Sequence, residues 1–404
     1  MKKLLGLFMA LAIAMPASAE LLRNFELTGD VQVIASDVRH NASGEFTTGT
    51  NMRVLAGGSF DVAENVRANL MFQYLNQWGS GPTIEGVTPG TIGKSANDYL
   101  DQIRLVEANV EMKELFGWLD MKVGRQFYGD EDSTVMYIGP RYYNSELNGA
   151  TNYNYATSID AVKLAYANDF VNANVIMGEL EIYNSAGAGV PPISATGNKH
   201  YMYGLDAKFR LSDPLSFQLY GYNIKDVGED YNGFYGGKLT FAPEAFLVSA
   251  EYARNHEGNR LIKESHDNPY LLKLDAKLNM DAFTPRAAFV YSKDFAAPFG
   301  NYRPGLLMGD WAPTEIILAY GRIYNVGLDY NWEKWNFALD GYAFQDRTAQ
   351  HSASLEADLV VKYDYNDNIQ LFAGAGYIKY NSNDSNTFDA ADNTKGQVGV
   401  LVRL

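Results

Sequence analysis

The chain has 404 residues, a formal net charge of −15 and no cysteine. The acidic balance argues against a nucleic-acid-binding protein, and the absence of cysteine excludes both stabilisation by disulfides and a CxxCH haem attachment site. The 28 Tyr and 21 Phe residues favour strands and suit a membrane interface.

Residues 1–19 have the pattern of a secretory signal peptide. Lys2 and Lys3 precede the apolar run Leu4–Met15, and Ala17-Ser18-Ala19 supplies small residues for cleavage before Glu20. This run is too short for a spanning helix, and no other run approaches the roughly 20 apolar residues that such a helix needs. We therefore expect an exported chain whose residues 20–404 form one large domain, because no linker or composition shift divides them.

From residue 23 onward, segments of about ten residues alternate apolar and polar side chains, which is typical of strands with one apolar face. In the segment from Tyr270, Leu272 and Leu274 alternate with Lys273 and Asp275. The pattern predicts about eighteen strands: 23–38, 48–60, 66–78, 99–112, 118–128, 157–167, 170–182, 199–211, 215–226, 231–242, 246–256, 269–280, 284–294, 322–332, 335–346, 353–364, 369–381 and 395–404.

The connections between these strands alternate between two kinds. Eight are short and turn-like: 61–65, 113–117, 168–169, 212–214, 243–245, 281–283, 333–334 and 365–368. Nine are mostly longer and polar: 39–47, 79–98, 129–156, 183–198, 227–230, 257–268, 295–321, 347–352 and 382–394. A soluble sandwich has no reason to sort its connections in this way, whereas an outer-membrane barrel has short periplasmic turns and long extracellular loops.

Aromatic residues gather beside the short turns, as expected for a membrane-interface girdle. These residues are Trp118, Phe241, Phe246, Phe283, Trp332, Trp335 and Tyr363. The alternating apolar residues of the last strand, up to Leu404, resemble the signal that barrel-assembly machinery recognises. The sequence therefore predicts an all-β fold: a single antiparallel transmembrane barrel of about 18 strands in the cell outer membrane.

The candidate functional residues are polar groups that would line or narrow the pore. On the non-apolar faces of the strands these are Lys122, Lys163, Lys208, Arg210, Lys273, Asp275 and Lys277, to which we add Arg125 at a strand end. The long connection 129–156 is the first constriction candidate, with Asp130, Glu131, Asp132, Arg141, Tyr142 and Tyr143. Connection 295–321 is the second, because it contains apolar residues that are unusual in a free extracellular loop: Leu306, Leu307, Met308, Trp311, Ile316 and Ile317. Both charge signs occur, so the lining does not define ion selectivity.

Nothing in the sequence resembles a catalytic, metal or cofactor site. The five histidines are scattered, no metal-ligand spacing joins them, and no GxSxG, HExxH or phosphate-loop motif occurs. We therefore expect no enzyme activity and no cofactor.

Three stretches together resemble the alginate-export type of outer-membrane porin. They are Val123-Gly124-Arg125-Gln126, Tyr128-Gly129-Asp130-Glu131 and Ser158-Ile159-Asp160-Ala161-Val162-Lys163-Leu164. The resemblance implies an 18-stranded monomeric barrel with porin-like transport, the strand number that the alternation also predicts.

The sequence thus favours a porin that lets small polar or anionic solutes pass, including carbohydrate or polysaccharide, with outer-membrane lipid and lipopolysaccharide as partners. The oligomeric state stays open. One alternative is a barrel that serves as a sleeve for a partner complex of electron transfer or polysaccharide export, suggested by the apolar connection 295–321. A membrane-embedded hydrolase is a third alternative, and it would need a catalytic set on the barrel rim.

Overall fold

The computed structural model describes residues 23–40, 45–78, 103–131, 133–140, 158–181, 199–225, 231–256, 269–295, 297, 300–302, 304–308, 321–345, 353–380 and 392–404. The predicted signal peptide lies outside these residues. Among the described residues, no helix has the length and apolar character needed to cross a membrane.

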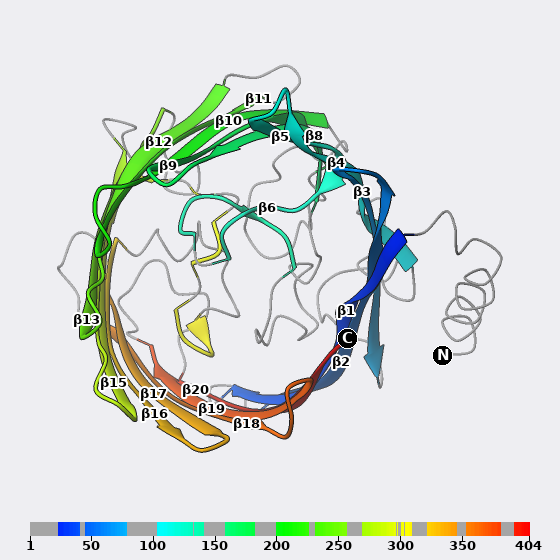
Figure 1. Ribbon diagram of the computed structural model, residues 1–404. Coiled ribbons are helices and arrows are strands. Elements are labelled where there is room, and N and C mark those ends of the chain that lie inside the picture. The colour runs from blue at the N-terminus through cyan, green and yellow to red at the C-terminus, as the bar shows by residue number, and fades with distance from the viewer. Residues whose placement is uncertain are drawn as a thin grey trace.

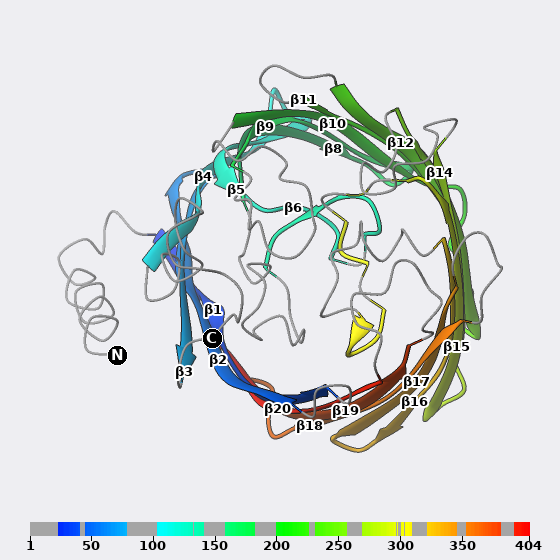
Figure 2. The same ribbon diagram turned by 180° about the vertical axis from the view of Figure 1, so that it is seen from behind.

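Eighteen antiparallel strands form one closed sheet, in which each strand pairs with the next and β1 also pairs with β20. Figures 1 and 2 show the strands as a ring around the lumen. The wall strands are β1 (Arg23–His40), β2 (Glu45–Ala63), β3 (Val66–Trp78), β4 (Ile103–Leu115), β5 (Leu119–Gln126), β8 (Ile159–Ala167), β9 (Val171–Glu181), β10 (Lys199–Arg210), β11 (Leu215–Lys225), β12 (Tyr231–Phe241), β13 (Phe246–Asn255), β14 (Tyr270–Leu278), β15 (Phe283–Lys293), β16 (Arg322–Trp332), β17 (Trp335–Gln345), β18 (Ser354–Asp364), β19 (Ile369–Lys379) and β20 (Asn393–Arg403).

This architecture confirms the predicted all-β barrel and its strand number. Each of the eighteen predicted segments corresponds to one wall strand, with ends that differ by a few residues. The main difference lies in the segment predicted as 118–128, which leaves the wall after Gln126. Beyond it, β6 (Tyr128–Gly129) and β7 (Tyr137–Ile138) form a separate two-stranded sheet that the sequence did not predict.

The two faces of the wall differ as the alternation predicts. On the outer face Leu205, Val326 and Leu359 are 52%, 67% and 44% exposed, whereas on the inner face Asp30 and Glu356 are buried. The aromatic residues predicted beside the short turns lie on the outer face, and some form ring pairs, with centroids 5.6 Å apart for Phe241 and Phe246 and 4.5 Å for Trp335 and Tyr363. The apolar face of the strands therefore forms the outside of the barrel, as a lipid-facing wall requires.

A charge placed on this outer face should destabilise the barrel. Leu359→Arg is expected to lower the free energy of unfolding from lipid bilayers by about 2–4 kcal/mol, because a lipid-facing arginine near mid-depth must be desolvated. The matched control is Val360→Arg, whose side chain is on the lumenal face of the same strand. Urea titration of both variants in liposomes measures the difference, and equal stability of the two would contradict the assignment of the faces.

A buried apolar cluster lies inside the barrel rather than between layers of sheet. Near the long-connection ends of the strands, inward side chains are apolar and 0–1% exposed: Ile176, Met202, Leu271, Ile323, Phe344 and Ile378. We call these six residues the apolar collar. Two segments of the chain that turn into the lumen pack against it, and Figures 1 and 2 show both of them within the ring of strands.

Candidate functional site

The first inward segment begins where β5 ends. The Gln126 side chain is fully buried, and its amide donates to the backbone oxygen of Ala161 on β8 at 3.0 Å. This hydrogen bond ties β5 to β8 at the point where the chain leaves the wall. Gly129 then adopts a φ of 89°, a conformation that glycine adopts at little cost and that turns the chain inward. The β6–β7 hairpin is tied by the Ser133 hydroxyl, which accepts from the backbone N–H of Met136 at 3.0 Å.

The second inward segment follows β15 and runs through the described residues up to 308. Phe295, Leu307 and Met308 are 0–2% exposed and belong to the same apolar cluster as the collar. Leu306–Met308 are therefore apolar because they pack inside the barrel of this chain, and they need no partner protein to cover them. Trp311, Ile316 and Ile317 lie outside the described residues.

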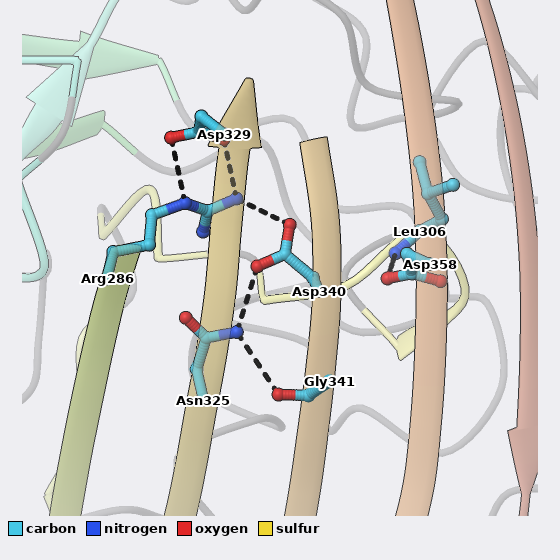
Figure 3. A network of polar contacts seen from close by, with 7 residues as sticks. All are labelled: Arg286, Leu306, Asn325, Asp329, Asp340, Gly341 and Asp358. Carbon is cyan, nitrogen blue, oxygen red and sulfur yellow. Dashed lines mark hydrogen bonds and ion pairs between the residues drawn. The ribbon is translucent and has the colours of Figure 1, made fainter. Parts of the chain in front are cut away.

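Two carboxylates on β18 hold the second segment by its backbone. Glu356 accepts from the N–H groups of Leu307 at 2.6 Å and Met308 at 3.0 Å, and Asp358 accepts from the N–H of Leu306 at 2.9 Å. Figure 3 shows the Leu306–Asp358 contact. Lys395 on β20 donates to the Leu306 backbone oxygen at 3.3 Å. Four hydrogen bonds to the backbone thus tie the second segment to β18 and β20, and we call these contacts the latch between wall and segment.

The two inward segments are joined to each other. Asn301 of the second segment donates from its backbone N–H to the Ser133 oxygen at 3.0 Å and from its side-chain amide to the Glu131 oxygen at 2.7 Å. The lumen is thus crossed by a continuous chain of contacts from β5 and β8, through Asn301, to β18 and β20. This crossing structure narrows the barrel, because an eighteen-stranded barrel is otherwise wide enough for an aqueous channel.

Between the hairpin and the wall lies a polar cavity of about 280 Å³. Lys163 and Lys238 line it together with the carboxylates of Asp206 and Glu251. Tyr220 donates to Glu251 at 2.6 Å, and Gln218 donates to Asp206 at 2.6 Å. The wall here presents both charge signs and several neutral hydrogen-bonding groups to the lumen.

A second polar network lies further along the wall, between β15 and β17. Arg286 donates to Asp329 through Nε at 3.1 Å and to Asp340 through Nη2 at 2.6 Å, as Figure 3 shows. Asn325 donates to the other Asp340 oxygen at 3.1 Å. One guanidinium therefore serves two carboxylates and fixes three neighbouring strands in the lumen.

Tyr302 connects the second segment to a predicted pore residue. The Lys273 ammonium lies 5.2 Å from the centroid of the Tyr302 ring, a distance typical of a cation–π contact. Burial, and then the nearby Tyr342 and Asp275, raises the pKa of Tyr302, so its hydroxyl stays neutral across physiological pH.

The structure places most described candidate residues on the inner face, although in separate groups. Lys122 lies opposite Lys163 and 3.5 Å from Glu107, and Lys273 lies 3.5 Å from Asp275. Lys208, Arg210 and Lys277 share the inward register of their strands. Asp130 lines the cavity, whereas Glu131 contributes its backbone oxygen to Asn301. Asp132, Arg141, Tyr142 and Tyr143 lie outside the described residues.

The prediction that Arg125 lines the pore is wrong. Because Lys122 faces inward, the odd residues Val123 and Arg125 face outward, and Val123 is 37% exposed. Arg125 forms a bidentate pair with Asp160, from Nε to Oδ1 at 2.8 Å and from Nη2 to Oδ2 at 2.7 Å. The prediction rested on the position of Arg125 at a strand end. Whether a residue of β5 faces lipid or lumen depends instead on whether its number is odd or even.

Sequence reasoning missed the residues of the latch and the collar as a site. The signal was present, because apolar residues such as Met202 and Ile323 occupy inward positions next to the long connections. Apolar residues at inward positions, where polar ones are expected, indicate where an inward segment packs against the wall. In the part of the chain that the structure describes, no group of three His, Asp or Glu side chains is arranged to hold a metal ion.

Comparison with known proteins supports a channel of this kind. A family model described as Gram-negative porin matches residues 6–384. A search of curated proteins finds no match. The family match and the strand number bear out the porin barrel that the resemblance implied, but the comparisons do not support the alginate-export type.

Solved porin structures share the fold at low sequence identity. Pseudomonas aeruginosa OccK9 (OpdG) is 11% identical with a TM-score of 0.65, over 95% of this chain and 100% of that chain. Pseudomonas aeruginosa OpdO is 11% identical with a TM-score of 0.64, over 96% and 99%. Acinetobacter baumannii OccAB1 is 9% identical with a TM-score of 0.60, over 95% and 98%. With its closed barrel, lipid-facing outer wall and narrowed lumen, the chain belongs to the Gram-negative porin family and forms an outer-membrane channel for small solutes.

Proposed function

We propose that the channel passes small polar solutes, including anionic solutes and carbohydrates, passively across the outer membrane. The observation that carries this proposal is the crossing structure: two inward segments joined through Asn301 and latched to β18 narrow a wide barrel. A solute must pass beside these segments, so they limit its size.

The lining supports selection by polarity rather than by one sign of charge. Lys163 and Lys238 offer ammonium groups to an anionic solute, while Gln218, Tyr220 and Asn174 offer hydrogen-bonding groups to a hydroxylated one. Carboxylates lie in the same cavity, which argues against a strongly anion-selective pore.

Recording from purified, refolded protein in planar lipid bilayers tests the proposal. We expect single-channel conductance with weak ion selectivity, seen as a small reversal potential across a salt gradient. Liposome swelling with neutral sugars of increasing size should show a sharp size limit. Heat-denatured protein is the control. Refolded barrels that conduct no ions and admit no sugar would contradict an open pore.

A further inference from the structure

The outer face carries a charge pattern that the channel function does not use. From β11 to β19, the outward positions of the described strand residues contain no carboxylate. They contain five cations, one on each of five strands: Lys225, Arg254, Lys293, Arg322 and Lys379. All five lie at the strand ends next to the long connections.

The height of these cations on the wall places them at the outer membrane interface. From Phe283 at the short-turn end to Lys293, β15 rises about 25 Å along the barrel axis, at ~3.3 Å per residue and a strand tilt of ~40°. This distance matches the apolar band of outer-membrane barrels. The outward residues between them, such as Ala287 and Phe289, are uncharged. Lys293 therefore lies where the acyl chains end and the headgroups begin.

Three of the cations gather with tyrosines on adjacent strands β13 to β16, which lie side by side in Figure 1. Tyr270 lies opposite Arg254 on one side and opposite Lys293 on the other, and Arg322 lies opposite Tyr291. The basic–tyrosine cluster consists of Arg254, Lys293, Arg322, Tyr252, Tyr270 and Tyr291.

The cluster is held together by ring contacts. The Tyr270 ring lies 6.0 Å from that of Tyr252 and 5.7 Å from that of Tyr291, and the Arg322 guanidinium lies 5.8 Å from the Tyr291 centroid. Tyrosines in contact suit the headgroup region, since each has an apolar ring and a polar hydroxyl. Guanidinium and ammonium groups at this level are the usual partners of phosphate.

The cluster is a local feature and does not follow from the charge of the chain, which is −15. The opposite rim is acidic, because each of the eight short turns carries a carboxylate: Glu64, Glu114, Asp169, Asp213, Glu244, Asp281, Glu333 and Asp367. Among the residues that the structure describes, the cluster therefore gives an anionic lipid a more favourable surface than the acidic short-turn rim does.

We propose that the basic–tyrosine cluster binds the phosphate groups of an anionic glycolipid in the outer leaflet of the outer membrane. Arg254, Lys293 and Arg322 would contact the phosphates, and the tyrosine rings would lie against the sugar and upper acyl regions. This inference rests on the outer-membrane location of the barrel and is independent of which solute the channel carries.

The test compares the R254Q/K293Q/R322Q variant with the native chain. Binding of lipopolysaccharide with a phosphorylated lipid A is measured on detergent-solubilised barrels by native mass spectrometry. Each basic residue near an anionic lipid surface contributes about a fivefold gain in binding, so we expect a roughly hundredfold loss in the variant. The dephosphorylated lipid should bind the native chain as weakly as the phosphorylated lipid binds the variant.

The matched control is K208Q/K238Q/K277Q, which removes the same number of charges from the inner face. It should bind the lipid like the native chain. Unchanged affinity of the outer variant, equal affinity of the native chain for both lipid forms, or full displacement of the lipid by millimolar inorganic phosphate would overturn the proposal. If the triple variant does not fold, judged by heat-modifiable migration, K293Q alone should show about a fivefold loss.

Discussion

Replacing Glu356 with alanine is expected to release the second inward segment and open a wider pore. The substitution removes the acceptor of two hydrogen bonds, which the backbone N–H groups of Leu307 and Met308 donate. At about 1 kcal/mol each, their loss shifts the equilibrium toward the released segment by roughly thirtyfold. In planar bilayers this should appear as a second, larger conductance level that the native channel occupies roughly thirtyfold less often.

The segment will not leave the lumen entirely, because its apolar contacts remain. Leu307 and Met308 pack within the buried cluster, and each side chain of this size contributes about 1.5–3 kcal/mol when buried. We therefore expect reversible switching between two conductance levels rather than a permanently wide pore. The larger level should also admit sugars above the native size limit.

The control for the charge is Asp364→Asn on the same strand. Its carboxylate lies at the short-turn end of β18, where it accepts from Gln370 at 2.5 Å. This variant should keep the native conductance. An unchanged conductance trace in Glu356→Ala would contradict the latch, and a similar change in Asp364→Asn would assign the effect to charge alone.

Gly305→Ala approaches the same latch from the other side. Gly305 has a φ of +85°, which alanine adopts with strain, and an added Cβ would lie 2.5 Å from a carboxylate oxygen of Glu356. This variant keeps the carboxylate but displaces the segment. It should therefore show the larger conductance level as well, which separates a steric release from a change of lumenal charge.

The wall could be predicted from the sequence because one rule governs all of it. Side chains alternate between lipid and lumen along each strand. The faces of Leu205 and Asp206 can therefore be predicted from the sequence of β10 alone. The alternation of connections then fixes the closure and the even strand number. For the same reason the ends of the eighteen strands needed only small adjustment.

The interior could not be predicted from the same rule. The latch joins Glu356 to Leu307, a contact across 49 positions, and Asn301 reaches Glu131 across 170 positions. Neither pair is marked by local spacing, and a lumenal carboxylate looks the same whether it faces water or accepts from a backbone N–H. Arg125 shows the complementary failure, because its position at a strand end suggested the pore while its parity placed it outside.

Replacing Arg286 with methionine is expected to lower both the stability of the barrel and the permeability of its pore to anions. The guanidinium is the shared partner of Asp329 and Asp340, and Asp340 is only 9% exposed. Removing one partner of such a group leaves carboxylates without a countercharge in a poorly solvated site. We expect the free energy of unfolding to fall by roughly 3 kcal/mol. This is near the lower limit for breaking a buried pair, because the Arg286 side chain is 26% exposed.

Two measurements distinguish the structural effect of Arg286 from its electrostatic effect. Urea unfolding in liposomes reports the stability, and the reversal potential across a salt gradient reports the charge of the lumen. Arg286→Met should shift the reversal potential toward cation selectivity, because two carboxylates then face the pore unneutralised. Arg286→Lys retains the charge but not the planar fork, so it should restore the native reversal potential while recovering only part of the stability. If Arg286→Met changes neither quantity, the network in Figure 3 does not organise this side of the lumen.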